Sequence, residues 1–102
     1  MNFVEGKLPA LVREELEAAN RMNPPFNSEH EGYAVLLEEV EETSYELDEM
    51  MTCLRMLWEC IKHDNPRSQE FAGKIAKHAM HLAAEAIQVA AMAEKFKTIR
   101  RI

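Results

Sequence analysis

The acidic run at residues 38–42, Glu-Glu-Val-Glu-Glu, holds the side chains of this chain that could do chemistry. On a helix, Glu39 and Glu42 lie one turn apart on the same face. Later in the chain, Glu85 and Gln88 repeat the same spacing. Carboxylate and amide oxygens are the ligands that a hard divalent cation such as Mg²⁺ prefers. The sequence therefore predicts a Mg²⁺ site if two helices bring these four side chains together, and Mn²⁺ is the alternative cation.

Two long helices are predicted to position these side chains. Residues 28–63 open on Ser28 and Glu31, the pattern of a capping box, and carry apolar residues at alternating steps of four and three. That stripe is predicted to pack against another helix. Its members are Tyr33, Leu37, Val40, Ser44, Leu47, Met51, Leu54, Trp58 and Ile61. A further helix is predicted over residues 66–97, with a seam of small and large apolar residues from Ile75 to Phe96.

Prolines set the breaks between the predicted helices. Pro9 suits the first turn of a short N-terminal helix, and the Asn23-Pro24-Pro25 segment ends it. The Asp64-Asn65-Pro66 segment turns the chain between the two long helices. In an antiparallel hairpin with this turn, Glu42 and Glu85 fall at nearly the same height, as do Glu39 and Gln88.

Composition supports one all-α domain over residues 1–102. The chain is rich in Ala, Leu and Glu and has only three Gly and four Pro, which favours helices. We predict a short N-terminal helix followed by a long antiparallel helical hairpin. A chain of 102 residues buries a modest core, so oligomerisation into a four-helix-type bundle is expected.

Charge and hydropathy exclude two classes of partner. The net charge is −6, and basic residues cluster only in a short tail, Lys95, Lys97, Arg100 and Arg101, which argues against nucleic-acid binding. The apolar stretch at residues 83–93 is too short to span a bilayer and is interrupted by Glu85 and Gln88, so no membrane partner is expected. Cys53 and Cys60 stand two helical turns apart, too far for a disulfide, and we expect free thiols and a cytoplasmic protein.

The two acidic motifs resemble those of the MazG-like, all-α nucleoside triphosphate pyrophosphohydrolases. The family pattern is Glu-Glu-x-x-Glu on one helix and Glu-x-x-Asp on a later one, and the resemblance covers residues 28–97. The resemblance implies hydrolysis of an NTP or dNTP to the monophosphate and pyrophosphate, with Mg²⁺ as cofactor, by a homodimer or homotetramer built from helical bundles. It also implies that Glu39, Glu42 and Glu85 are metal ligands, with Glu38 as a catalytic side chain close to the metal or its water.

The sequence departs from the family pattern at Gln88, which stands where the family has Asp. An amide offers one carbonyl oxygen to a cation but no charge, so metal affinity should fall. The sequence is therefore compatible with two functions. One is the Mg²⁺-dependent pyrophosphohydrolase, with Gln88 as a weak fourth metal ligand. The other is a catalytically inactive helical oligomer that acts as an interaction or structural protein.

Two further side chains are candidates for substrate binding. His81 shares a stripe with His78, Glu85 and Gln88, and could contact phosphate or serve as an additional metal ligand; a half-exposed polar flank is the structural alternative. Lys95 could reach the triphosphate, although a cation near a helix C-terminus has a structural reason to be there. With no P-loop in the sequence, a metal would have to hold the phosphates.

Overall fold

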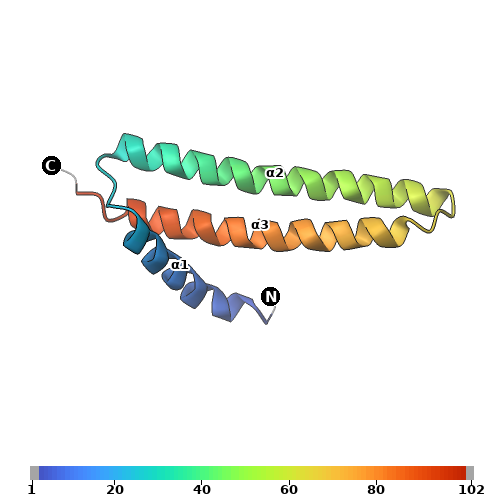
Figure 1. Ribbon diagram of the computed structural model, residues 1–102, viewed down its shortest axis with the longest axis horizontal. Helices are drawn as coiled ribbons and strands as arrows, with labels where there is room; N and C mark the ends of the chain where they lie inside the picture. Colours follow the sequence, from blue (N-terminus) through green and yellow to red (C-terminus); the bar gives the residue numbers. More distant parts are fainter. Residues whose placement is uncertain (1–2, 101–102) are drawn as a thin grey trace. The chain divides into compact units, whose positions relative to one another are not determined.

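The computed structural model describes residues 3–100, and this part of the chain contains helices and no strands (Figure 1). A short 3₁₀ turn, η1 (Glu5–Lys7), leads into α1 (Leu8–Met22). The two long helices are α2 (Glu29–Lys62) and α3 (Ser68–Phe96). The predicted all-α class, with a short N-terminal helix and a long helical hairpin, is confirmed.

Helix α1 begins and ends where the prolines require. Pro9 occupies the first turn, where its missing N–H costs no helical hydrogen bond. Asn23, which precedes Pro24, is extended with φ −137° and ψ 147°. The ring of a proline disfavours the helical conformation of the residue before it, so α1 ends at Met22.

Helix α2 opens on the predicted cap. The Glu31 backbone N–H donates to Ser28 Oγ at 3.1 Å. The reciprocal bond differs from a standard capping box, because the Glu31 carboxylate accepts from Asn27 Nδ2 at 3.0 Å and from the Asn27 backbone N–H at 3.4 Å. From Glu29, α2 runs without interruption to Lys62.

The turn after α2 uses a left-handed residue and a side-chain cap. Asp64 has φ 51°, a conformation that a short polar residue tolerates better than a branched one. Asn65 Oδ1 accepts a hydrogen bond from the Arg67 backbone N–H at 2.9 Å. Asn65 therefore caps as predicted, and regular α-helix begins at Ser68, two residues after the predicted start at Pro66.

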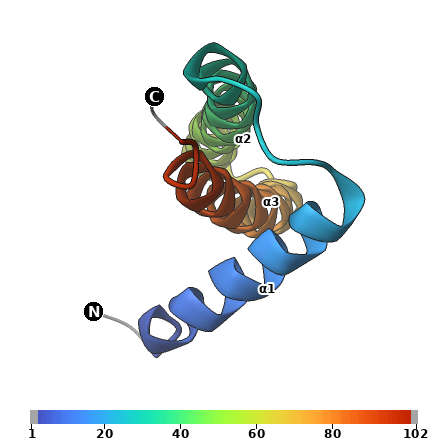
Figure 2. The same ribbon diagram turned by 90° about the vertical axis from the view of Figure 1, so that its left-hand side faces the viewer.

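The chain divides into two compact units that each contain part of α2 and part of α3. Residues 1–40 and 85–102 form the first unit, and residues 41–84 form the second. In the first unit, α1 lies against the C-terminal part of α3 (Figure 2). Leu8, Val12 and Leu16 of α1 line one groove together with Ala90 and Ala93 of α3.

The core of the second unit is small and lies between α2 and α3. Cys53, Cys60 and Phe71 are buried and form one cluster, against which Leu57 and Ile75 pack. Both cysteines are free thiols, as expected from their spacing. Because the cluster is formed by residues at helical spacing on α2, it defines which face of this helix is turned inward.

The inward face of α2 is not the stripe that the sequence predicted. In the second unit, the members of that stripe are 46% to 58% exposed. We refer to Leu47, Met51, Leu54, Trp58 and Ile61 as the α2 stripe. The face that packs is its flank, which carries Met50, Cys53, Leu57 and Cys60. Within this unit the stripe therefore does not pack against α3 and remains an exposed apolar face, and its packing against another helix stays a prediction.

Candidate functional site

Two of the predicted metal ligands lie together in the first unit. Glu39 of α2 and Glu85 of α3 each offer a carboxylate oxygen, and these atoms lie within 4.8 Å of one another. Both residues are half-buried. Two ionised carboxylates at this separation repel each other, and a cation between them would relieve the repulsion. The structure thus brings together Glu39 and Glu85, two of the four predicted ligands, from the two sides of the hairpin.

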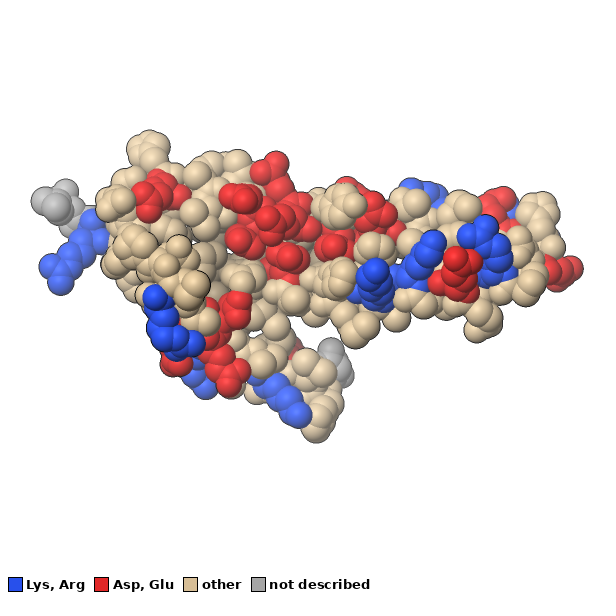
Figure 3. All heavy atoms as spheres, viewed as in Figure 1, with Lys and Arg blue, Asp and Glu red and all other residues tan. Residues whose placement is uncertain are grey.

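The remaining carboxylates of the acidic run are positioned by the periodicity of α2. Glu42 follows Glu39 by three residues on the uninterrupted helix, one turn further along, and is exposed. Glu38 is also exposed, and its position next to Glu39 turns it by about 100° around the helix axis. Figure 3 shows acidic side chains gathered along the middle of α2. The catalytic role of Glu38 stays a prediction.

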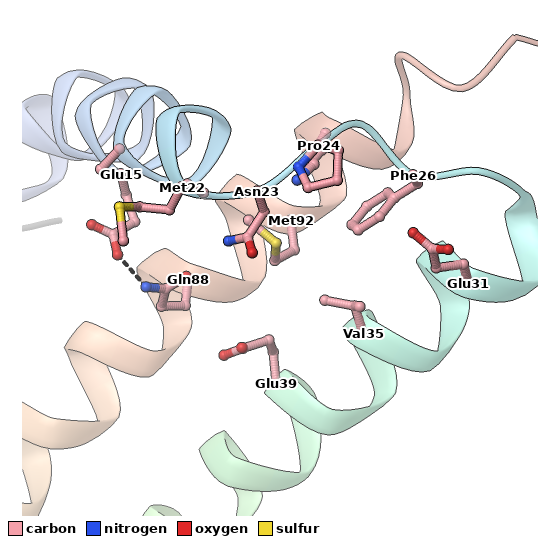
Figure 4. Close-up of a pocket in the computed structure, with 13 residues that line it drawn as sticks. Glu15, Met22, Asn23, Pro24, Phe26, Glu31, Val35, Glu39, Gln88 and Met92 are labelled. Carbon is pink, nitrogen blue, oxygen red and sulfur yellow. Dashed lines mark hydrogen bonds between the residues drawn. The ribbon is translucent and has the colours of Figure 1, made fainter.

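Gln88 makes a contact that the sequence did not indicate. Its Nε2 donates a hydrogen bond to the carboxylate of Glu15 on α1 (Figure 4, dashed line). The two groups are part-buried and belong to the same unit. A carboxylate from α1 therefore lies beside the Gln88 amide.

Glu15, Glu39 and Gln88 line one pocket of about 500 Å³ in the first unit. In Figure 4, Glu39 of α2 points into the space that Gln88 of α3 borders from the opposite side. Apolar side chains complete the wall: Met22, Pro24, Phe26, Val35 and Met92. A concave, mostly apolar site with a few polar groups and a volume of this size is typical for a small organic ligand.

Lys95, a predicted substrate-binding residue, lines the same pocket. It is only 4% exposed, which is unusual for a lysine. Its Nζ lies 4.7 Å from the centre of the Phe26 ring, a cation–π contact. An aromatic face and a positive charge therefore stand together at the wall of the pocket.

His81 lies in the second unit and in a different group. The carboxylate of Glu46 on α2 is 2.8 Å from His78 Nδ1 and 3.5 Å from His81 Nδ1. The side chain of Glu46 is only 14% exposed, so it does not belong to the solvated acidic face of α2. The polar stripe of α3 thus contributes two imidazoles to one carboxylate.

Sequence reasoning missed three residues that the structure places at these sites. Glu15 follows Val12 by three residues and precedes Ala19 by four, so it lies on the apolar face of α1, and that position was the available signal. Glu46 lies on the flank of α2 that packs in the second unit, whereas the sequence pattern pointed to the neighbouring apolar stripe as the packing face. Phe26 follows two prolines in a connecting segment, where no periodicity applies.

Comparison with known proteins assigns the chain to no group. No family model, no curated protein and no solved structure matches this chain. Among the described residues, no helix combines the length and the apolar character needed to cross a membrane. The fold and the site together define an all-α protein with a carboxylate pair beside a pocket large enough for a small ligand.

Proposed function

We propose that this protein is a Mg²⁺-dependent nucleotide pyrophosphohydrolase that cleaves an NTP or dNTP to the monophosphate and pyrophosphate. One observation carries the proposal: Glu39 lines the 500 Å³ pocket and also lies within 4.8 Å of Glu85. A carboxylate pair at the edge of a pocket can hold a cation beside a bound ligand. The proposal agrees with the resemblance of the two acidic motifs to the MazG-like enzymes.

The donor set suits Mg²⁺. Oxygen ligands of Mg²⁺ lie at about 2.1 Å from the ion, so opposite oxygens of an octahedral set are roughly 4 Å apart, and the Glu39 and Glu85 oxygens, which lie within 4.8 Å of one another, are near enough to share one ion. Mg²⁺ binds proteins through one or two carboxylates and retains water and substrate phosphates as its other ligands. Glu42, one turn beyond Glu39, is the third carboxylate in this proposal. When bound, the cation would neutralise charge on the phosphates.

The pocket residues have distinct roles in this proposal. The Phe26 ring and the side chains of Met22 and Met92 offer apolar surface to the base. The Lys95 ammonium attracts phosphate charge. The Glu15–Gln88 hydrogen bond presents polar atoms that can pair with the edge of the base or with the sugar.

The test is to incubate the protein with each NTP and dNTP in Mg²⁺ or Mn²⁺ and to measure pyrophosphate and monophosphate release. Glu39→Gln and Glu85→Gln should each lower kcat/KM by about 100-fold or more, since each removes a proposed metal ligand. Glu41→Gln is the matched control, because Glu41 is an exposed carboxylate of the same acidic run. Absence of release with every nucleotide, or an equal loss in the control, would refute the enzyme.

A second candidate is favoured by the exposed α2 stripe and by the Glu15–Gln88 bond. In this alternative, the protein is a helical oligomer without turnover, and Gln88 holds α1 on α3 instead of binding a cation. The α2 stripe then serves as the interface between copies. Oligomerisation together with no pyrophosphate release and no Mg²⁺-dependent rise in melting temperature is the result that this candidate requires.

A further inference from the structure

We propose that Glu46, His78 and His81 form a binding site for a divalent transition metal, with Zn²⁺ as the ion to test. The three residues lie in the second unit. Each offers one ligand atom, and the three atoms lie within 4.8 Å of one another. This site is separate in residues and chemistry from the carboxylate pair at Glu39 and Glu85, and it does not depend on the proposed hydrolase.

The helical spacing explains how two imidazoles reach one point. His78 and His81 are three residues apart on α3, so their side chains are neighbours on one face. Their rings meet edge to face with centroids 6.1 Å apart. Both Nδ1 atoms are turned toward Glu46, which reaches them from α2. Two helices of one unit therefore supply the ligands, and no loop has to move to assemble them.

The distances match a tetrahedral site. Zn²⁺ binds histidine nitrogen and carboxylate oxygen at 2.0 to 2.2 Å, which places neighbouring ligand atoms about 3.4 Å apart. The observed separations from the Glu46 carboxylate oxygens to the two Nδ1 atoms are 2.8 and 3.5 Å. Small side-chain rotations would be enough to bring the three atoms around one ion.

The ligand types select the metal. Two imidazoles and one carboxylate form the donor set of catalytic zinc sites and of non-haem Fe(II) sites. Mg²⁺ prefers oxygen ligands and seldom takes nitrogen, so it should compete poorly here. Metal binding requires an Nδ1 without a proton: a neutral ring binds as the tautomer that carries its proton on Nε2, and a protonated ring releases its Nδ1 proton to the solvent.

Burial gives the site a closed side and an open side. The side chains of Glu46 and His78 are 14% and 22% exposed, whereas that of His81 is 52% exposed. A shielded carboxylate attracts a cation more strongly than a fully solvated one. The exposed side leaves the fourth position to water or to an added ligand, as in zinc sites that keep an open position.

The test is calorimetric titration of the whole protein with Zn²⁺ in excess Mg²⁺, which occupies hard oxygen sites. One Zn²⁺ should bind per chain and should raise the melting temperature. His81→Ala and Glu46→Gln should each weaken binding by more than about 100-fold, since each removes a direct ligand. His81 is exposed and Gln has the shape of Glu, so both variants should fold; circular dichroism checks this.

Three controls separate this site from other metal ligands. His63→Ala changes an exposed histidine outside the group, 3.9 Å from Glu59, and should leave Zn²⁺ affinity unchanged. Glu39→Gln should also leave it unchanged. Co²⁺ in place of Zn²⁺ should show the visible absorption of nitrogen-ligated cobalt, and His81→Ala should abolish it. Failure of Zn²⁺ to bind, or equal binding by wild type and His81→Ala, would reduce the group to an interhelical hydrogen bond and overturn the proposal.

Discussion

The Gln88 amide donates a hydrogen bond to the Glu15 carboxylate and thereby links α3 to α1 within one unit. The bond satisfies two part-buried polar groups, because a neutral donor meets a charged acceptor. An aspartate in place of Gln88 would place a second negative charge beside Glu15.

Gln88→Asp should therefore make the stability of the protein depend on Mg²⁺. Without a cation, repulsion from Glu15 should lower the melting temperature, by about 4–8 °C for each kcal/mol lost. Added Mg²⁺ should raise the melting temperature of the variant more than that of wild type. Thermal melts over a Mg²⁺ series measure this. Combining Glu15→Gln with Gln88→Asp restores an amide donor to the pair, so the double variant should recover the lost melting temperature. If Mg²⁺ raises the melting temperatures of Gln88→Asp and wild type equally, the predicted repulsion is absent.

The α2 stripe should form the contact between copies of the chain. Its four-and-three spacing is that of a helix-packing seam, and its members are exposed in a single chain. Trp58→Glu should reduce the mass measured by light scattering from a multiple of 11.7 kDa to 11.7 kDa. Met80→Glu changes an equally exposed apolar residue on α3 and should leave the mass unchanged. A monomeric wild type at high concentration would rule this interface out.

Two glycines in helices should respond to alanine in opposite directions. A Cβ at Gly32 would lie 2.5 Å from Phe96 Cδ2 and 3.2 Å from Ile99 Cδ1, so Gly32→Ala should destabilise by about 1–3 kcal/mol. A Cβ at Gly73 would meet nothing within 4 Å, so Gly73→Ala should stabilise by about 0.5–1 kcal/mol. Urea unfolding measures both, and the same sign for the two variants would be inconsistent with this packing.

Cys53 and Cys60 should react slowly with a thiol reagent in the folded protein. Both side chains are at most 7% exposed and pack with Phe71. A reagent in solution cannot reach a sulfur atom that neighbouring side chains cover. Labelling should be at least about tenfold slower in buffer than in denaturant. Phe71→Ala should speed labelling by opening the cluster, whereas rapid labelling of the native wild type would show that the cluster is not closed.

The Arg67–Glu70 pair should make the stability of the N-terminal end of α3 depend on pH. Arg67 Nε donates to Glu70 Oε2 at 2.8 Å, and this hydrogen bond and the charge of Arg67 hold the pKa of Glu70 below its usual value. A lowered folded-state pKa contributes stability above the unfolded pKa, and this contribution is lost as the pH falls through the folded value. Glu70→Gln should thus lower the melting temperature slightly at neutral pH. The difference from wild type should vanish in acid, and a difference that grows in acid would contradict the sign.

The sequence alone determined the helices and their ends. Pro9, Pro24 and Pro66 remove backbone donors and constrain their neighbours, and Ser28 and Asn65 supply caps, all within a few residues of chain. These effects are local, so no knowledge of distant contacts was needed to predict them. The hairpin also followed, because a short turn between two long helices leaves an antiparallel arrangement as the compact one.

Only the tertiary structure decided which face of α2 packs and which side chains meet. The stripe and its flank differ by a small rotation of the helix, and both carry apolar residues, so the pattern did not distinguish them. The rotation that buries Cys53 and Cys60 also turns Glu46 toward His78 and leaves Trp58 exposed. Likewise, the pairing of Glu15 with Gln88 joins residues 73 positions apart. Such pairings depend on the relative rotation of packed helices, which periodicity along one chain segment does not encode.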